Sequence, residues 1–318
     1  MNTSVVRGGA PGEAEPPAVP VELVDLTPST QDLAARRRAE GRAAPFAVLA
    51  AQQSAARGRL GRRFSSPAGR ALALTVVHES ALAPGDRSWF PLALGVAALD
   101  ALRALPGAAA GLEAAGLGLK WPNDLHTAAG GKLGGILVEG RGAGIVLLGI
   151  GLNLRGPIRG EDGSEVPGAV WLHGPGGLLD DGDGEGLTAA EVPALRDALA
   201  AGIASRVARE LEALEASGGD ASATGLDERF AMTCVTLGRD VRVEPLGHDG
   251  PRGSAPLTGR ALGIDDRGRL LVDPGPEQGG VVAVDVGDVR HLRAVRGSGG
   301  TMAGPVRNGH DGEEAGTR

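Results

Sequence analysis

The amino-acid sequence predicts an α+β protein with two parts: a large domain built around a central sheet, then a small all-β domain. In the larger part, short apolar segments rich in branched residues alternate with longer segments whose apolar residues recur at helical spacing. Beyond Cys234, short apolar segments follow one another at intervals of about ten residues, separated by turn signals such as Asp266-Arg267-Gly268. A chain of 318 residues is long enough for both parts.

The large domain, residues 21–233, is predicted to hold three helices. The first follows the start signal Thr27-Pro28-Ser29-Thr30 and ends at Gly41. The second ends before Pro106, and the third is expected to be broken near Pro193. These helices cover residues 31–41, 91–105 and 190–216, and strands are predicted at 46–51, 71–78, 118–121, 135–139 and 145–149.

The small domain, residues 234–295, is predicted to be a β-barrel. Its strands are expected at 241–243, 257–264, 269–272 and 281–284. Low complexity indicates disordered tails at 1–20 and 296–318 and a flexible insertion at 155–187. The acidic run in that insertion lacks the terminal glutamate of an EF-hand loop, so we interpret it as a solvated loop.

Composition excludes several classes of protein. The net charge of -7 argues against a general nucleic-acid binder. One cysteine excludes an internal disulfide framework and a cysteine-rich metal site. No secretory h-region is present, and no apolar run approaches the ~20 residues of a membrane span. These observations predict a cytoplasmic protein that binds neither nucleic acid nor membrane.

An arginine- and glycine-rich loop lies between the first two predicted strands, from Gln53 to Gly69. Glycine lets the backbone approach a ligand closely, and Arg57, Arg59 and Arg62 supply planar forks that match phosphate or carboxylate oxygens. The loop therefore suits a polyphosphate or an acyl phosphate. A solvated basic loop remains the alternative, and the absence of a following GK[ST] excludes a P-loop.

Three further segments place polar residues near strand ends. In Lys120-Trp121-Pro122-Asn123-Asp124, a cation, an amide and a carboxylate lie together where sheets often bind ligands, although Pro-Asn-Asp is also ordinary turn chemistry. Lys132 enters a strand of branched residues, as a ligand-binding cation or as an edge-strand gatekeeper. Gly149-Ile150-Gly151, closed by Asn153, is weak evidence alone.

The order and spacing of these segments resemble the biotin–protein ligase family. Its signature runs Ser-Thr-Asn, Gly-Arg-Gly-Arg-x-Gly-Arg, Lys-Trp-Pro-Asn-Asp, Lys-[LV]-x-Gly-Ile-Leu-x-Glu and Gly-Ile-Gly-x-Asn, and each part has a counterpart here. Segments 259–265 and 287–292 resemble the family's small domain, so the resemblance covers residues 21–295. It implies a catalytic domain like that of class II aminoacyl-tRNA synthetases, with a mixed or antiparallel sheet flanked by helices, and an SH3-like barrel.

The resemblance also implies an activity and site residues. Such a ligase activates biotin with ATP to biotinyl-5'-AMP and transfers it to a lysine of a biotin carboxyl carrier protein. The implied catalytic residues are Lys132, Arg57, Arg59 and Asp124. The implied biotin and adenylate contacts are Ser29, Thr30, Gln31, Gln53, Arg57, Gly58, Arg59 and Lys132. The implied ATP contacts are Arg62, Phe64, Lys120, Trp121, Asn123 and Asn153, with Mg²⁺ arriving on ATP and no protein metal ligand assigned.

The sequence departs from the family pattern at four positions. Gln31 replaces the usual asparagine, Ala56 a glycine, Leu60 a frequent arginine and Phe64 a common tryptophan. The principal charges are kept, so the resemblance still implies an active enzyme.

Partners and rival functions follow from the same resemblance. The implied partners are carriers of acetyl-CoA, propionyl-CoA or pyruvate carboxylase, and the implied state is a monomer or weak homodimer. About 20 residues precede the catalytic region, so no DNA-binding repressor domain is expected. Lipoate–protein ligase and a non-catalytic biotin- or nucleotide-binding regulator are the alternatives.

Overall fold

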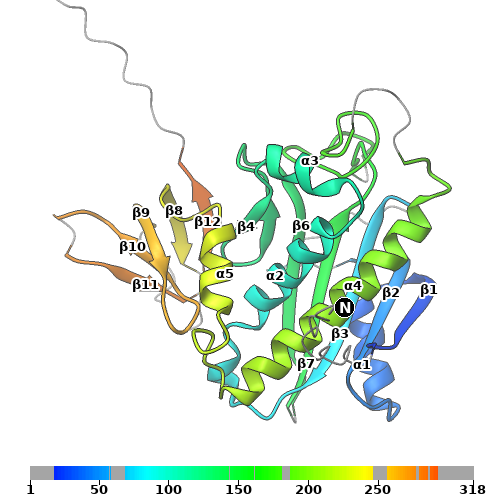
Figure 1. The fold of residues 1–318 in the computed structure, drawn as a ribbon, viewed down its shortest axis with the longest axis horizontal. Helices are drawn as coiled ribbons and strands as arrows, with labels where there is room; N and C mark the ends of the chain where they lie inside the picture. Colours follow the sequence, from blue (N-terminus) through cyan, green and yellow to red (C-terminus); the bar gives the residue numbers. More distant parts are fainter. Residues whose placement is uncertain are drawn as a thin grey trace, which may run out of the picture.

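The computed structural model contains two sheets connected through residues 234–239 (Figure 1). It describes residues 18–56, 58, 69–142, 144–160, 162–180, 187–245, 256–276, 279–285 and 287–292. The larger sheet has seven strands in the order β1-β2-β3-β7-β6-β5-β4, and the smaller has five in the order β11-β10-β9-β8-β12. Within the described residues, no helix is both long and apolar enough to cross a membrane.

The seven-stranded sheet is mixed, since β1 runs parallel to β2 and every other neighbouring pair is antiparallel. Branched residues dominate its central strands, as expected for strands buried in a sheet. The strands are β1 (Val21–Thr27), β2 (Phe46–Gln53), β3 (Ala71–Glu79), β4 (Gly118–Lys120), β5 (Asp124–His126), β6 (Lys132–Gly140) and β7 (Ile145–Asn153).

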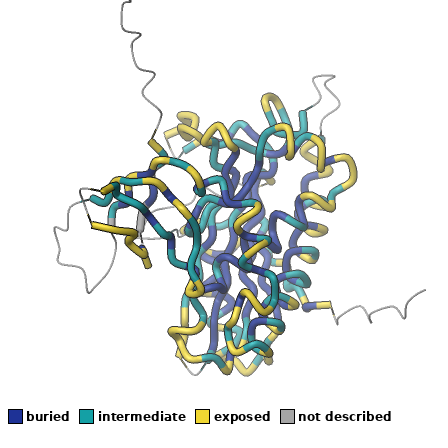
Figure 2. Tube along the Cα trace, turned by 60° about the vertical axis from the view of Figure 1, so that its left-hand side comes forward, coloured by how far each residue is buried: buried dark blue, intermediate teal, exposed yellow. Residues whose placement is uncertain are grey.

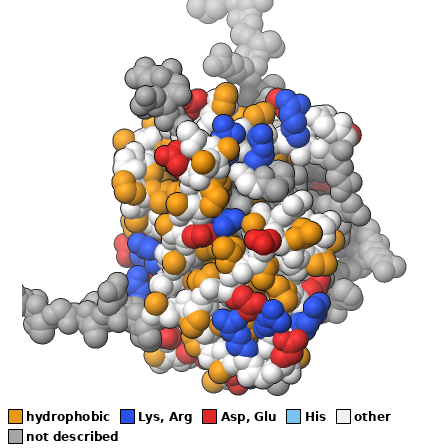
Figure 3. Space-filling view, turned by 90° about the vertical axis from the view of Figure 1, so that its right-hand side faces the viewer, with side chains coloured by type: hydrophobic (Ala, Val, Ile, Leu, Met, Phe, Trp, Pro, Cys, Tyr) orange, Lys and Arg blue, Asp and Glu red, His pale blue; other side chains and the backbone are white. Residues whose placement is uncertain are grey.

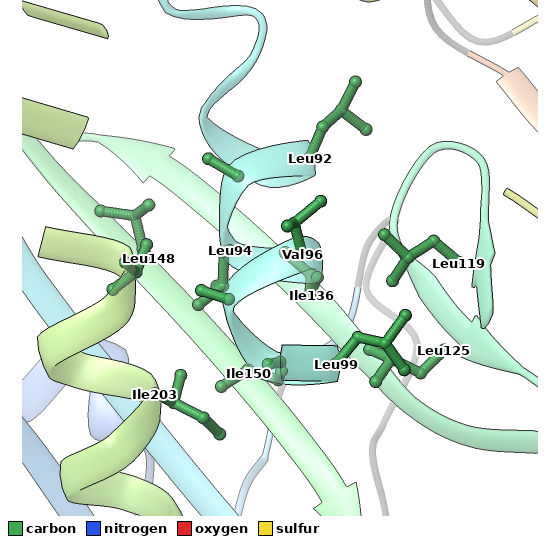
Figure 4. Close-up of a cluster of buried hydrophobic side chains, with 14 of the residues drawn as sticks. Leu92, Leu94, Val96, Leu99, Leu119, Leu125, Ile136, Leu148, Ile150 and Ile203 are labelled. Atoms are coloured by element: carbon green, nitrogen blue, oxygen red, sulfur yellow. The ribbon is translucent and has the colours of Figure 1, made fainter. Parts of the chain in front are cut away.

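Two helices, α2 (Phe90–Arg103) and α4 (Val192–Ala216), cover one face of this sheet (Figure 1). Their apolar residues meet Leu148 and Ile150 of β7 and Ile136 of β6 in the main core (Figure 4). Each fully buried leucine or isoleucine there stabilises the fold by about 1.5–3 kcal/mol. This core lies between the two helices and the sheet, where the chain is buried (Figure 2).

Among the described residues, the helix α1 (Thr30–Ala39) covers part of the other face. Under α1 lies a second, smaller apolar cluster that includes Phe46 and Leu147. The outer side of α1 is charged, and Arg37 and Arg42 both pair with Glu22 of β1. Figure 3 shows this mixture of opposite charges at the lower end of the face that carries β1 and α1.

The five-stranded sheet is antiparallel and packs beside the edge strand β4 (Figure 1). Its strands are β8 (Asp240–Pro245), β9 (Leu257–Ile264), β10 (Leu270–Asp273), β11 (Val282–Val284) and β12 (Gly287–His291). Val235 N–H donates to Leu119 O (2.8 Å), so the segment leading into the small sheet pairs with β4. Two indoles complete the junction: Trp89 donates to Asp266 O (2.7 Å) and Trp121 donates to Gly268 O (2.9 Å).

Most predicted elements are confirmed, with boundaries moved by a few residues. The third helix is not broken: α4 begins at Val192, and Pro193 occupies its first turn, where a missing N–H costs nothing. The sequence analysis did not predict β1, β5, β12, α3 (Ala108–Ala114), α5 (Leu226–Thr233) or the short 3-10 helix Pro84–Arg87.

The prediction of a flexible, solvated insertion at 155–187 is wrong for part of its described residues. Residues 168–173 form backbone hydrogen bonds with β6 and with the end of β7, and Leu172 is completely buried. Abundant glycine and acidic residues on either side concealed this short apolar segment.

Candidate active site

The candidate site lies on the sheet face that α2 and α4 leave uncovered. There, Ala50, Ala73, Gly151 and Gly135 are register partners on four neighbouring strands, and we call them the small-residue row. Asp124 of β5 is the next partner in the same row. Because none of the four carries more than a methyl group, longer polar side chains can lie across this face.

Lys132 and Asp124 form an ion pair over this row, with Lys132 Nζ 2.7 Å from Asp124 Oδ1. Both groups lie above Gly135: a Cβ built there would be 3.2 Å from Asp124 Oδ1 and 3.3 Å from Lys132 Nζ. The Lys132 side chain is 42% exposed and that of Asp124 only 18%. The pair therefore presents a cation to solvent above a carboxylate that is mostly buried.

Asp124 is held in its ionised form. Burial raises the pKa of this carboxyl, but the neighbouring His126 imidazole and the Lys132 ammonium outweigh burial and lower the pKa below its ordinary value. His126 is buried, and its Nε2 lies 3.6 Å from Asp124 Oδ2, beyond hydrogen-bond distance. The site therefore keeps a fixed negative charge directly behind the lysine at neutral pH.

A hydroxyl and amide network lies beside the ion pair. The side-chain oxygen of Gln53 accepts from both the backbone N–H (2.8 Å) and the hydroxyl (3.2 Å) of Thr30, and the Thr75 hydroxyl donates to Thr30 Oγ1 (2.9 Å). Ser29 is buried at the start of α1. This network fixes the beginning of α1 against β2 and β3.

Gln31 lies on the same face of the sheet, over Gly149, which is two residues from Gly151 of the small-residue row. Its Nε2 donates to Leu137 O (2.8 Å) and lies over Gly149, where a Cβ would be only 2.5 Å away. Its Oε1 is buried and has no hydrogen-bond partner among the described residues. Gly149 and Gly151 are two residues apart on β7, so Gln31 and Lys132 face the same side of the sheet. An orphaned buried acceptor is costly, and a ligand N–H donor would satisfy it.

The remaining residues of the segment Lys120–Asp124 divide into two groups. Asn123 Nδ2 donates to Ile136 O (2.9 Å), and the half-buried Lys120 is the register partner of Asp124, so both lie near Asp124. Trp121 does not present its ring there, because its indole is buried in the core and hydrogen-bonded to Gly268. The ring supports the motif from behind, and the predicted contact of Trp121 with ATP stays a prediction.

Asn153, predicted to contact nucleotide, is buried at the end of β7. Its Nδ2 donates to Val170 O (2.9 Å) and, at the longer distance of 3.4 Å, to Lys132 O. The structure thus brings Asn153 to the main chain of Lys132.

The arginine-rich loop is largely outside the described residues. Arg57, Arg59, Leu60, Arg62 and Phe64 all fall there, so their predicted contacts keep their status as predictions. Of the same loop, Ala56 is buried and Gly58 is half-buried.

Two participants were missed by sequence reasoning. His126 could have been found, because it lies two residues after Asp124 and alternation on a strand puts both on one face. Thr75 gave no signal, since a threonine in a strand is ordinary. Within the part of the chain that the structure describes, no group of three metal-ligating side chains occurs.

Comparison with known proteins finds ligases that act on biotin. Residues 23–154 match the model of the biotin/lipoate A/B protein ligase family. A biotin–[acetyl-CoA-carboxylase] ligase of Mycobacterium tuberculosis is 35% identical over 276 residues, 86% of this chain and 89% of the relative. A second such ligase, from Paracoccus denitrificans, is 43% identical over 129 residues, which is 39% of this chain and 49% of the relative.

The fold is also that of a solved ligase. A structure described as biotin protein ligase from Aquifex aeolicus in complex with biotin and ATP superposes with a TM-score of 0.60 at 20% identity, covering 86% of this chain and 99% of that chain. The extent of the match to the mycobacterial relative decides the family. This chain belongs to the biotin–protein ligase family.

Proposed function

We propose that this protein is a biotin–[acetyl-CoA-carboxylase] ligase. The biotin carboxylate attacks the α-phosphorus of ATP, pyrophosphate leaves, and biotinyl-5'-AMP forms. The amine of a carrier lysine then attacks the acyl carbon, AMP leaves and an amide forms. Family membership supports both steps. The observation that carries the proposal is the ion pair of Lys132 and Asp124 beside a network of glutamine and threonine side chains.

Lys132 supplies the positive charge that the first step needs. Two anions, a carboxylate and a phosphate, must approach each other, and an ammonium between them offsets their repulsion and the charge that develops at the α-phosphate. Asp124 fixes the ammonium at one place by its 2.7 Å contact. Preorganised charge of this kind requires no reorganisation during the reaction.

Asp124 also suits the second step. Its lowered pKa keeps it ionised, so it can accept a hydrogen bond from the incoming amine of the carrier. Asn123, next to it, holds the middle of β6 through Ile136 O. We assign Asn123 and Asp124 to placing Mg-ATP or the carrier lysine.

The amide network suits the ureido ring of biotin. That ring carries N–H donors and a carbonyl acceptor, and the orphaned Gln31 Oε1 is a buried acceptor that a ring N–H would satisfy. Ser29, Thr30 and Gln53 lie at the same end of the site, at the start of α1 and the end of β2.

We assign the remaining roles from the family pattern. Arg57, Gly58 and Arg59 would cover the adenylate, while Arg62, Phe64, Lys120 and Asn153 would contact ATP. Mg²⁺ would enter with the phosphates of ATP, which hold this ion with few protein oxygens. We further propose biotin carriers of acetyl-CoA, propionyl-CoA or pyruvate carboxylase as partners, and a monomer or weak homodimer as the working state.

The test is a reconstituted reaction of the purified chain with ATP, Mg²⁺, biotin and a biotin-acceptor domain. Biotin-dependent release of pyrophosphate and the mass gain of one biotinyl group on the acceptor lysine are expected. Lipoate replaces biotin in a parallel reaction. Pyrophosphate release with lipoate but not with biotin would assign the chain to lipoate transfer. No pyrophosphate release with either acid would favour a non-catalytic binder.

A further inference from the structure

Residues 166–173 hold the main chain of Lys132 from the side of β7. Lys132 N–H donates to Gly168 O (2.7 Å), and Val170 N–H donates to Lys132 O (2.9 Å). Ala169 is the bridge partner of Lys132. Both backbone groups of the lysine are therefore engaged by a segment that follows it in the chain by more than thirty residues.

The same segment is bound to the end of β7. Leu172 N–H donates to Asn153 O (3.2 Å), and His173 N–H donates to Leu154 O (2.9 Å). The strands β6 and β7 pair directly from Gly140, opposite Val146, to Gly134, opposite Leu152. Segment 166–173 thus occupies the place between the two strands where their direct pairing stops.

Packing reinforces these hydrogen bonds. Leu172 is completely buried, and Val170 lies directly on Gly131, the residue before Lys132. A Cβ built on Gly131 would be 2.4 Å from Val170 Cγ1, closer than real contacts allow. Gly131 has no positive φ, so alanine would fit its backbone; the contact with Val170 is the shortest one that a Cβ would make, and Thr127 Oγ1, at 3.1 Å, is the next.

We propose that segment 166–173 is a positioning element for Lys132, acting through Val170 and the two backbone hydrogen bonds. This inference rests on the proposed role of Lys132 in adenylation. The Lys132 ammonium keeps its position above Gly135 only if the main chain of Lys132 keeps its own position. A displacement of about 1 Å at a reacting centre can lower the rate on the order of 100-fold. Val170 is a positioning residue, since nothing requires it to touch substrate.

The test is a double-mutant cycle at Gly131 and Val170, read by biotin-dependent pyrophosphate release. Gly131→Ala should lower kcat by about tenfold or more while the KM for biotin changes by less than about threefold, because the shift affects the lysine and not Gln31 or Gln53. Gly131→Ala/Val170→Ala removes both valine methyls from the contact and should recover kcat to within about threefold of the parent. Val170→Ala alone loses the packing on Gly131 but keeps both backbone hydrogen bonds, so it should lower kcat by at most about threefold, less than Gly131→Ala does.

Gly140→Ala is the matched control, because Gly140 is the last residue of β6, the strand that Gly131 immediately precedes, and a Cβ there meets nothing within 4 Å. It should leave kcat unchanged. A Gly131→Ala enzyme with parental kcat would overturn the proposal, and so would a folded double variant as slow as the single one. An inactive parent enzyme would instead overturn the proposed function.

Hydrogen exchange tests the same proposal if Gly131→Ala does not fold. In the parent protein, the amide of Lys132 should exchange slowly, since it is bonded to Gly168 O. Exchange of that amide as fast as the amides of exposed residues 162–165 would contradict the positioning role.

Discussion

At the level of the candidate site, the two faces of the central sheet are built from the same strands but from opposite kinds of residue. The small-residue row of Ala50, Ala73, Gly151 and Gly135 faces the candidate site. One residue away on each strand, register partners Leu49, Leu74, Ile150 and Ile136 form a large-residue row facing α2 and α4. The difference teaches that one strand sequence can encode stability on one side and room for polar chemistry on the other.

Removal of the site cation should have the largest effect on activity. Lys132→Ala is expected to lower the kcat of pyrophosphate release by about 10²–10³-fold, the loss typical of one transition-state charge stabiliser. Its side chain is 42% exposed, so the Tm should change by less than about 2 °C. Arg209→Ala, an exposed cation on α4, is the control. Parental turnover by folded Lys132→Ala would remove Lys132 from the mechanism.

Truncation in the large-residue row should instead affect stability. Ile150 is 4% exposed, and Ile150→Ala should lower the free energy of unfolding by about 2–5 kcal/mol. Urea unfolding measures this loss, and kcat measured well below the Tm should remain within about threefold of the parent. A large loss of kcat with little loss of stability would show that the two faces are not separable.

A methyl group added at Gly149, which is next to Ile150 in β7 but faces the candidate site, should affect the binding of biotin. Gly149→Ala places a Cβ 2.5 Å from Gln31 Nε2 and 3.2 Å from Leu137 O, so Gln31 must move. The KM for biotin should rise by about tenfold, with a smaller change in kcat. Gly140→Ala is again the control. An unchanged KM would mean that Gln31 does not contact biotin.

Acid should have the smallest effect, and it should act at His291 of β12, in the five-stranded sheet. Burial, with Lys120, Arg239 and His126 nearby, lowers the pKa of His291 to about 4. The geometry is compatible with a neutral ring: the Thr236 hydroxyl accepts from the backbone N–H of Trp121 (3.1 Å) and has its own hydrogen to donate to His291 Nε2, 3.2 Å away.

The free energy of unfolding should fall as the pH falls, because the unfolded chain binds a proton at His291 more tightly than the folded protein does. The unfolded chain takes up a proton at His291 near its ordinary pKa of 6.5, while the folded protein does so only near 4. Stability from this group is full above pH 6.5, falls between 6.5 and 4 and is constant below 4. Because His291 is partly exposed, a loss of about 1 kcal/mol from pH 7 to pH 5 is expected. His291→Gln should reduce that loss in urea unfolding; an unchanged pH dependence would contradict it.

Much of this molecule could be predicted from its sequence, because apolar periodicity and turn residues act locally. The helices near 31–41 and 91–105 and the central strands were predicted in this way. The proximity of Lys132 and Asp124 followed from the family resemblance, since no local rule pairs two residues on neighbouring strands. β1 and β5 were missed, one an exposed edge strand and the other only three residues long.

Two structural roles that the sequence analysis missed have a common physical cause. Trp121 and Val170 both act through residues distant in the chain, Gly268 and Lys132, and local patterns contain no information on such partners. The support that the Trp121 ring gives its motif was therefore not predicted, and a glycine-rich insertion was interpreted as a solvated loop.

The placement of the indoles has a spectroscopic consequence. The chain has three tryptophans and no tyrosine, so its intrinsic fluorescence comes from three rings alone. Trp89 and Trp121 are buried at the junction of the two sheets, and Trp171 is half-buried in the segment that holds Lys132. The unlabelled protein thus carries optical reporters at two separate places. Trp89→Phe/Trp121→Phe would leave Trp171 as a single emitter, whose signal follows the surroundings of Lys132 in real time.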